Sequence, residues 1–365
     1  MTGDISSLLW YLGAMLFASM FAYIGNHERS VFKRKCYIVL SFLVIILFCG
    51  CRFFVGNDYA NYTYAFQSYK NNGYSAVYEP GFDFLYYVFA DNPCGYIYVF
   101  FIATIVTYYF IFKTLVREDC LSWGIYFTFA LGFLICANDQ IRQCIAISIF
   151  IYSIKFIERG EFIKYLCCVL GACLFHYSAI VLIGAYFIRF IKFSRFVWGV
   201  LIISAYFLYL IGFWQEYVVR LMLVIPHYGE LAVSSMRFLQ AAETSSGLGI
   251  LFKVCLALSI VITYNKLQKP LLAKIYLCGS FLGIVSVGFL LLERVSFYML
   301  YTNILVFPLL IKNRKVKIIS TAVITVSFLY YVLQFYFGLE KHGAVPYRTI
   351  FFENVVMPNY SLGND

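Results

Sequence analysis

Apolar runs long enough to cross a lipid bilayer recur along the whole chain, and they constrain its fold more than any other feature. A hydrocarbon core of about 30 Å takes about 20 helical residues. Of the 365 residues, 62% are hydrophobic and 13% are charged, whereas soluble domains carry about 25% charged residues. The pattern predicts an all-α polytopic membrane protein with twelve transmembrane helices, at residues 6–24, 36–55, 95–112, 121–137, 141–157, 165–177, 178–191, 196–213, 247–264, 271–292, 295–311 and 318–337.

Lysine and arginine gather on one side of these spans. One set of loops holds 19 basic and five acidic residues, a net charge of +14, and the opposite set holds nine basic and 13 acidic residues, a net charge of −4. Under the positive-inside rule the basic side is cytoplasmic, which places both termini in the periplasm. We expect a single membrane domain over residues 1–365, with outer segments 56–94, 214–246 and 338–365 that are too long for turns. Long loops on a rigid scaffold commonly carry function, so we expect the site on the outer face.

The net charge, the cysteines and one amphipathic stretch have simple interpretations. The net charge of +10 does not indicate nucleic acid binding, because no basic run is interleaved with stacking aromatics outside the membrane. Ten of the twelve cysteines lie inside apolar runs, which leaves neither a framework of paired loop cysteines nor a zinc spacing, so they are expected to be packing residues. The stretch "EYVVRLMLVI" within 214–246 is amphipathic and lies either along the membrane surface or in a buried re-entrant helix.

Isolated charges near the outer membrane boundary form the candidate site. An ionisable side chain at membrane depth is costly and is a functional candidate by default. Each one also has an ordinary explanation: Arg52 can snorkel to the headgroups, and Arg142 can pair with Asp139. Six clusters from distant parts of the sequence reach the same side, and this joint placement favours function. Their members are Arg52, Asp58, Glu79, Asp83, Asp139, Arg142, His176, Glu293, Arg294 and Arg348.

Several arginines, a few carboxylates and one histidine suit glycosyl transfer from a polyprenyl diphosphate donor. Arginine presents a planar fork of donors that matches phosphate oxygens, and it stabilises a diphosphate as it departs. A carboxylate or imidazole can take the proton of the attacking hydroxyl. No aspartate has an acidic partner two residues away, so we expect a reaction without a metal or other cofactor, and no GxSxG motif supports a hydrolase.

Six segments resemble the EpsG family of bacterial exopolysaccharide and O-antigen (Wzy-type) polymerases, in matching order and spacing from about residue 37 to 350. These segments are "CRFFVGNDYANY", "YEPGFDFLYY", "IRQCIAISIFIYSI", "FHYSAIVLI", "ERVSFYM" and "VPYRTI". The resemblance marks seven positions, which are Arg52, Asp58, Glu79, Arg142, His176, Arg294 and Arg348. Asn57 departs from the small or hydroxyl residue expected beside Asp58 and puts nothing essential in doubt.

The resemblance implies a bacterial inner-membrane glycosyltransferase with a GT-C-like fold and a periplasmic active site. It implies transfer of a growing glycan from undecaprenyl diphosphate to the non-reducing end of another lipid-linked repeat unit. The implied partners are that lipid-linked oligosaccharide, membrane lipids and a chain-length regulator protein.

The individual roles are our own inference from the residues. Arg142 and Arg294 are expected to clamp the diphosphate, with Arg52 and Arg348 assisting. The candidates for the general base are Asp58, Glu79 and His176, and we favour Asp58 because nearby Arg52 should keep it ionised. Tyr59, Tyr62 and Tyr64 form either a sugar platform or part of the interfacial aromatic belt.

Two other classes of function stay open on sequence alone. A flippase or exporter of lipid-linked sugars also often has twelve spans, but it predicts charges along a midplane path and an internal repeat. A membrane O-acetyltransferase requires a histidine that faces a cytoplasmic acyl donor, whereas His176 is predicted on the outer side. The glycan profile of a deletion strain separates the three.

Overall fold

A computed structural model describes residues 4–71, 73, 75–213, 217, 247–287, 289–337 and 343–353. Within these residues the chain is all-helical, and its only extended pairing is an isolated antiparallel bridge between Arg52 and Thr349. The α-helices are α1 (Ile5–His27), α2 (Val31–Gly50), α3 (Tyr59–Asn71), α4 (Pro80–Phe89), α5 (Gly95–Arg117), α6 (Leu121–Ala130), α7 (Phe133–Asp139), α8 (Ile141–Arg159), α9 (Phe162–Cys173), α10 (Arg195–Leu210), α13 (Leu248–Thr263), α14 (Pro270–Val285), α15 (Leu290–Leu300), α16 (Asn303–Ile311) and α17 (Lys317–Phe337). Three 3₁₀ helices are η1 (Tyr177–Phe190), η2 (Tyr264–Lys266) and η3 (Arg314–Val316).

The chain divides into two compact units, a division that the sequence analysis does not anticipate. The first unit comprises residues 1–180 and 324–365, and the second comprises residues 181–323. Eight of the ten candidate site residues belong to the first unit, and Glu293 and Arg294 belong to the second.

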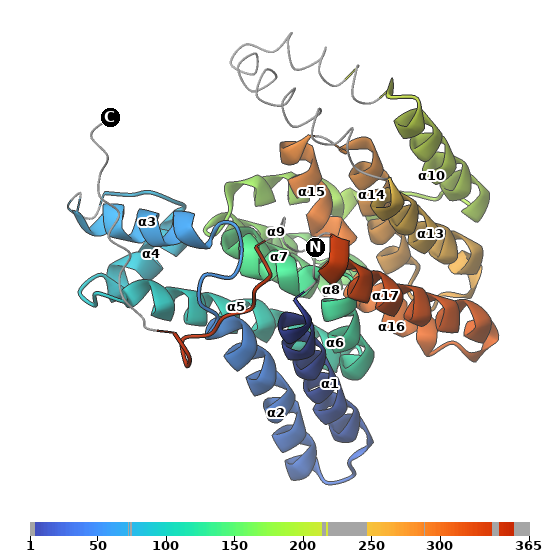
Figure 1. The fold of residues 1–365 in the computed structure, drawn as a ribbon. Helices are drawn as coiled ribbons and strands as arrows, with labels where there is room; N and C mark the ends of the chain where they lie inside the picture. The colour runs from blue at the N-terminus through green and yellow to red at the C-terminus, as the bar shows by residue number, and fades with distance from the viewer. Residues whose placement is uncertain are drawn as a thin grey trace. The chain divides into compact units, whose positions relative to one another are not determined.

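The first unit is built on the antiparallel hairpin of α1 and α2 (Figure 1). On α1 the buried face includes Ala14, Ala18 and Ala22, and such small side chains let helix backbones approach closely in a membrane. The Ser41 hydroxyl of α2 donates to the Ala18 carbonyl at 2.8 Å and ties the two helices together. The hairpin packs against α5 and α6, α5 packs against α8, and α8 packs against α9.

The second unit is a bundle in which α10, α13 and α14 pack against one another (Figure 1). The strongest packing of α14 is against α15, and α14 also contacts α16. Gly279 of α14 makes the contact with α15 possible, because a Cβ there would lie 2.5 Å from the amide nitrogen of Leu300.

Among the residues that the structure describes, five helical segments are long and apolar enough to cross a membrane, or six if a bent pair counts as one span. The bent pair is α6 and α7, which meet at an angle of 62° where a single helix over 121–137 is predicted. The break falls at Gly132, whose φ of +81° is a left-handed conformation that glycine adopts without strain. The five unbroken segments are Ile5–His27, Gly95–Arg117, Leu248–Lys266, Leu292–Ile311 and Arg314–Phe335. The structure thus shows a membrane protein, and the count of twelve spans and the periplasmic termini remain predictions.

Two of the predicted spans are short helices in the structure. A helix with the twelve residues of α9 is about 18 Å long, less than a hydrocarbon core of about 30 Å. The 14 residues of η1 form a 3₁₀ helix, which rises more steeply and covers about 28 Å.

The outer segment 56–94 contains two helices, α3 and α4, that the sequence analysis treated as loop. Both contact α5, which anchors them to the first unit. The predicted surface helix within 214–246 lies outside the described residues, as do all but residues 343–353 of the predicted tail.

Candidate active site

Glu79 is the centre of a buried polar cluster in the first unit. It precedes α4 as the N-cap residue, and Pro80 follows at the first helical position, where a missing N–H costs nothing. The side chain of Glu79 is only 6% exposed. A buried carboxylate needs charged or hydrogen-bonding partners to offset the loss of water, so its surroundings define the site.

The two carboxylate oxygens of Glu79 join three separate segments of the chain. Oε2 forms an ion pair with Nη1 of Arg142, at the start of α8. Oε1 lies 3.1 Å from Nδ1 of His176 and accepts a hydrogen bond from the Tyr177 amide at 3.2 Å. The sequence analysis selected Glu79, Arg142 and His176, and the structure brings these three together.

A close backbone contact holds α4 against the segment that carries His176. The Gly81 amide donates to the Leu174 carbonyl at 2.7 Å, where α9 has just ended. A Cβ at position 81 would lie 2.7 Å from that same oxygen, so the contact requires glycine. The order Glu-Pro-Gly in the motif therefore has a physical reason: it supplies the carboxylate, starts the helix and permits the approach.

The charge state of Glu79 follows from these contacts. Burial raises its pKa, but the hydrogen bond from His176 and the positive charge of Arg142 outweigh that effect and bring the pKa down to about 2. A carboxylate this acidic is ionised and fully engaged at neutral pH. Glu79 is therefore suited to orient Arg142 and His176 and unsuited to accept a proton.

Arg142 keeps part of its hydrogen-bonding capacity. Its guanidinium lies over the Tyr78 ring at 3.9 Å from the centroid and is 5.9 Å from the Tyr62 ring. Its Nε is buried and has no hydrogen-bond partner among the described residues, while the side chain as a whole is 21% exposed. A partly exposed guanidinium that keeps donor capacity is suited to bind an anionic oxygen.

Tyr78 belongs to the site, although the sequence analysis passed over it. The Asp83 carboxylate accepts from the amides of Val77 (3.0 Å) and Tyr78 (2.9 Å), which fixes the backbone just before Glu79. The signal in the sequence was its place next to Glu79, within the same motif, with Asp83 five residues further on.

Asp58 lies in the same region as Tyr78. Burial raises the pKa of the Tyr78 phenol, Arg142 opposes the shift, and the negative charge of Asp58 adds to it. The Asp58 carboxylate is half-buried and accepts from the Asn61 amide at 3.1 Å. Its own backbone amide donates to Asp139 at 2.9 Å, directly before α8. Asp58 therefore has a less engaged carboxylate than Glu79.

Arg52, predicted to assist at the diphosphate, lies in a buried environment of backbone carbonyls. The residue is 1% exposed. Its Nη1, Nη2 and Nε donate to the carbonyls of Cys49 (2.6 Å), Asn138 (3.0 Å) and Val55 (3.2 Å). The guanidinium joins the end of α2 to the end of α7.

Gly56 and the C-terminal tail complete this junction. Gly56 has a φ of +106°, and a Cβ there would lie 2.5 Å from the Asn138 carbonyl oxygen. Its amide donates to the Gly343 carbonyl at 2.8 Å, and the Phe53 amide donates to the Arg348 carbonyl at 2.9 Å. The tail segment 343–353 is thus paired with residues 51–56, while the Arg348 side chain is exposed.

Two of the three tyrosines of the predicted platform are buried. Tyr59 is 1% exposed and packs on Phe100, with ring centroids 4.5 Å apart. Tyr62 is 5% exposed and contacts the aromatic core of α4. Of the three, only Tyr64 is exposed, at 46%.

Arg294 lies on α15 in the second unit and is half-buried. Its neighbour Glu293 approaches Lys253 at 3.9 Å, a pairing internal to that unit. The positions of the two units relative to one another are not determined, so Arg294 is not part of the described cluster.

The fold and the site together define a polytopic membrane protein with an arginine–carboxylate–histidine cluster where three helical segments meet. A model of the EpsG family matches residues 35–349, and the chain belongs to this family. This confirms the resemblance drawn from the motifs, all six of which lie within or border the matched range. No curated protein and no solved structure matches the chain.

Proposed function

We propose that the protein polymerises polysaccharide repeat units in O-antigen or capsule biosynthesis, from an active site on the periplasmic face of the bacterial inner membrane. In this proposal a growing glycan passes from undecaprenyl diphosphate to the non-reducing end of another lipid-linked repeat unit. Membership of the EpsG family supports the class of reaction. The observation that carries the proposal is the meeting of Glu79, Arg142 and His176, with an unpaired donor left on Arg142.

The transfer step uses groups that the cluster supplies. The acceptor hydroxyl oxygen attacks C1 of the donor sugar, and the bond between C1 and the phosphate oxygen breaks. The electron pair of that bond leaves with undecaprenyl diphosphate, and the hydroxyl proton passes to a base. Arg142, held by Glu79 and stacked on Tyr78, stabilises the negative charge that grows on the diphosphate.

Asp58 is the base in this proposal. Glu79 is less suited to that role, because its contacts with Arg142, His176 and the Tyr177 amide lower its pKa and occupy both carboxylate oxygens. In this proposal His176 donates its Nδ1–H to Glu79, and its Nε2 accepts a hydrogen bond from a substrate hydroxyl. The exposed Arg348 assists with the diphosphate, and the reaction proceeds without a metal. Membrane lipids and a chain-length regulator protein are the remaining proposed partners.

Reconstituted polymerisation tests the proposal directly. The purified full chain is placed in lipid vesicles with purified undecaprenyl-diphosphate-linked repeat units, and the products are resolved by length on gels. We expect the wild type to build long chains and Arg142→Gln to lower the rate by about 100-fold or more, because an oriented charge in the transition state is lost. Lys70→Gln is the matched control, since it removes an exposed cation from α3 in the same outer segment.

Two outcomes would reject the proposal. Wild-type vesicles that move labelled single repeat units across the bilayer without lengthening them would indicate a flippase. An Arg142→Gln variant that builds chains at the wild-type rate would show that the cluster is not the site of reaction.

A further inference from the structure

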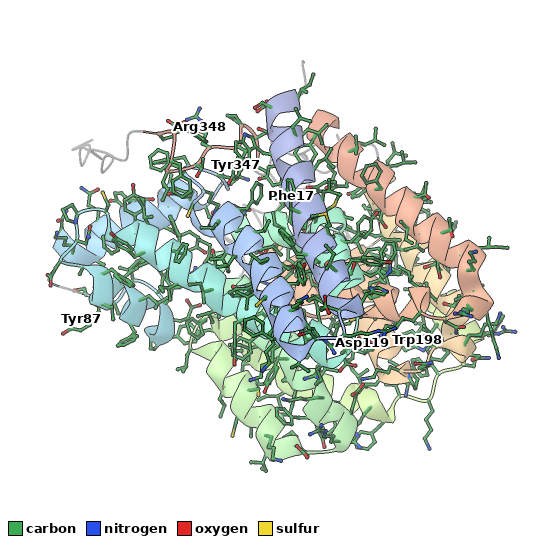
Figure 2. All side chains as sticks on the ribbon, turned by 90° about the horizontal axis from the view of Figure 1, so that it is seen from below. Phe17, Tyr87, Asp119, Trp198, Tyr347 and Arg348 are labelled. Atoms are coloured by element: carbon green, nitrogen blue, oxygen red, sulfur yellow. The ribbon has the colours of Figure 1, made fainter. Side chains whose placement is uncertain are left out.

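An apolar groove of about 670 Å³ lies in the first unit, bounded by α1, α2 and the tail. Its walls include Trp10 and Phe17 from α1, Leu47 and Phe48 from α2, and Tyr347 from the tail. The volume is in the range of small-molecule sites, about 300–1,000 Å³. Figure 2 shows Tyr347 between Arg348 on the tail and Phe17 on α1.

The groove opens on a surface that is apolar over a wide area. Leu9 and Phe17 are 65% and 52% exposed on α1, and Leu47 is 49% exposed on α2. Since α1 is a candidate membrane span, these side chains face lipid and the groove is accessible from the bilayer. Its occupant must then be an apolar chain.

The tail connects this groove to the polar junction beside the candidate active site. Gly343 lies against Asn57, one residue before Asp58, whereas Thr349 lines the groove. The six peptide units between Gly343 and Thr349 span about 20 Å at most. The exposed Arg348 lies on this segment, between two groove-lining residues. The tail segment 343–349 therefore borders the apolar groove at Thr349 and contacts the polar loop of Asn57 at Gly343. Arg348 lies on this segment, next to Thr349.

We propose that the groove binds the isoprenoid chain of the lipid-diphosphate substrate, with Arg348 at its polar end. This proposal rests on the proposed function, because it assigns a place to the lipid of that reaction. A single branched apolar chain attached to a diphosphate fits a groove whose tail residues Tyr347 and Thr349 flank the exposed Arg348. A phospholipid chain or residues 354–365 of the tail are the competing occupants, and both are outcomes of the test.

Gly13 allows the groove to be filled without disturbing the protein. It lies on α1 among the groove-lining residues, and a Cβ added there meets no atom within 4 Å. Replacing a glycine inside a helix by leucine also favours the helix. Gly171 on α9 is the matched control, because its Cβ also meets nothing within 4 Å and it lies outside the groove.

The experiment uses the full chain in nanodiscs with two photoreactive probes. One is a polyprenyl diphosphate that carries a diazirine on its chain and no sugar, and the other is a phosphatidylglycerol with a diazirine on an acyl chain. Crosslinked peptides are mapped by mass spectrometry for the wild type, Gly13→Leu and Gly171→Leu. Polymerisation is measured in parallel over a range of substrate concentrations.

We expect the polyprenyl probe to label peptides of α1, α2 and the tail, and Gly13→Leu to reduce that labelling several-fold. The same variant should raise KM for lipid-linked units about tenfold, whereas Gly171→Leu changes neither quantity. The inference is overturned if phosphatidylglycerol labels the groove equally and polyprenyl diphosphate does not compete with it. Crosslinks that place residues 354–365 in the groove, or a wild-type KM in Gly13→Leu, would overturn it as well.

The same data separate the two proposals. Specific labelling of the groove without any chain lengthening leaves the lipid site standing and rejects the polymerase. Chain lengthening by Gly13→Leu at the wild-type KM rejects the lipid site and leaves the polymerase standing.

Discussion

Arg52 and Arg142 look alike in the sequence, but the fold uses them in opposite ways. Each lies at the end of an apolar helix on the predicted outer side, close to an aspartate. Arg52 is 1% exposed, and its guanidinium donates to three backbone carbonyls. Arg142 is partly exposed, pairs with Glu79 and retains an unpaired Nε. An arginine at a helix end can therefore either join backbone segments or bind a ligand, and its position in the sequence does not distinguish the two roles.

The largest expected effect is on folding, at Arg52. Arg52→Ala leaves three buried carbonyls without a donor and opens a cavity, so we expect it to lower the free energy of unfolding by about 4 kcal/mol or more. The amount of folded protein in membranes and its thermal midpoint in detergent measure this. A stable Arg52→Ala variant that has lost only activity would indicate that Arg52 takes part in the reaction. That result would contradict a structural role for Arg52.

Gly56 tests the same junction through its backbone. Gly56→Ala combines a strained positive φ with a Cβ that would lie 2.5 Å from a carbonyl oxygen, so we expect a loss of about 3 kcal/mol. Gly73→Ala is the matched control, because it has a φ of +66° in the same outer segment and open space around its Cβ. It should cost only the backbone strain, about 1 kcal/mol. Equal thermal shifts in the two variants would contradict the close packing at Gly56.

The Glu79 cluster predicts a dependence of stability on pH. The pKa of Glu79 falls from 4.5 to about 2 on folding, so its ionised form stabilises the fold above pH 4.5 and this contribution is lost as pH falls toward 2. The contribution is about 2 kcal/mol once the partial exposure of Arg142 is allowed for. Between about pH 5 and pH 3 the thermal midpoint should therefore drop less in Glu79→Gln than in the wild type.

Asp91→Asn is the control for that measurement, because it removes an exposed carboxyl from the same outer segment. It should keep the acid dependence of the wild type. An unchanged dependence in Glu79→Gln would show that the carboxylate is not held by Arg142 and His176.

The smallest effect is expected at the exposed tyrosine of α3. Because Tyr64 is the exposed member of the predicted platform, Tyr64→Ala should raise KM about threefold and leave stability unchanged. Tyr59→Ala should instead lower stability, since Tyr59 is 1% exposed. A larger rise in KM for folded Tyr59→Ala than for Tyr64→Ala would indicate that Tyr59 contacts the sugar, as the sequence predicts.

Local patterns in the sequence predicted the membrane class, the all-helical fold and the residues of the central cluster. Arg142, Glu79 and His176 were found because charges are rare at the ends of apolar runs. The burial of Arg52 and Tyr59 could not be predicted, because it depends on the tail, some 300 residues away, and on α5. The 62° bend at Gly132 and the helices within 56–94 were also missed. The signals for α4 were nevertheless present, since Pro80 is a typical first residue of a helix.

The most direct test of the central claim compares conservative substitutions of the two arginines. Arg52→Lys and Arg142→Lys both keep the charge and lose the planar fork. The quantity to measure is the rate of chain lengthening per folded molecule in reconstituted vesicles. We predict that Arg142→Lys accumulates normally and loses about 10- to 100-fold in this rate, whereas Arg52→Lys accumulates poorly and keeps its rate. A wild-type rate per folded molecule in Arg142→Lys would contradict the account.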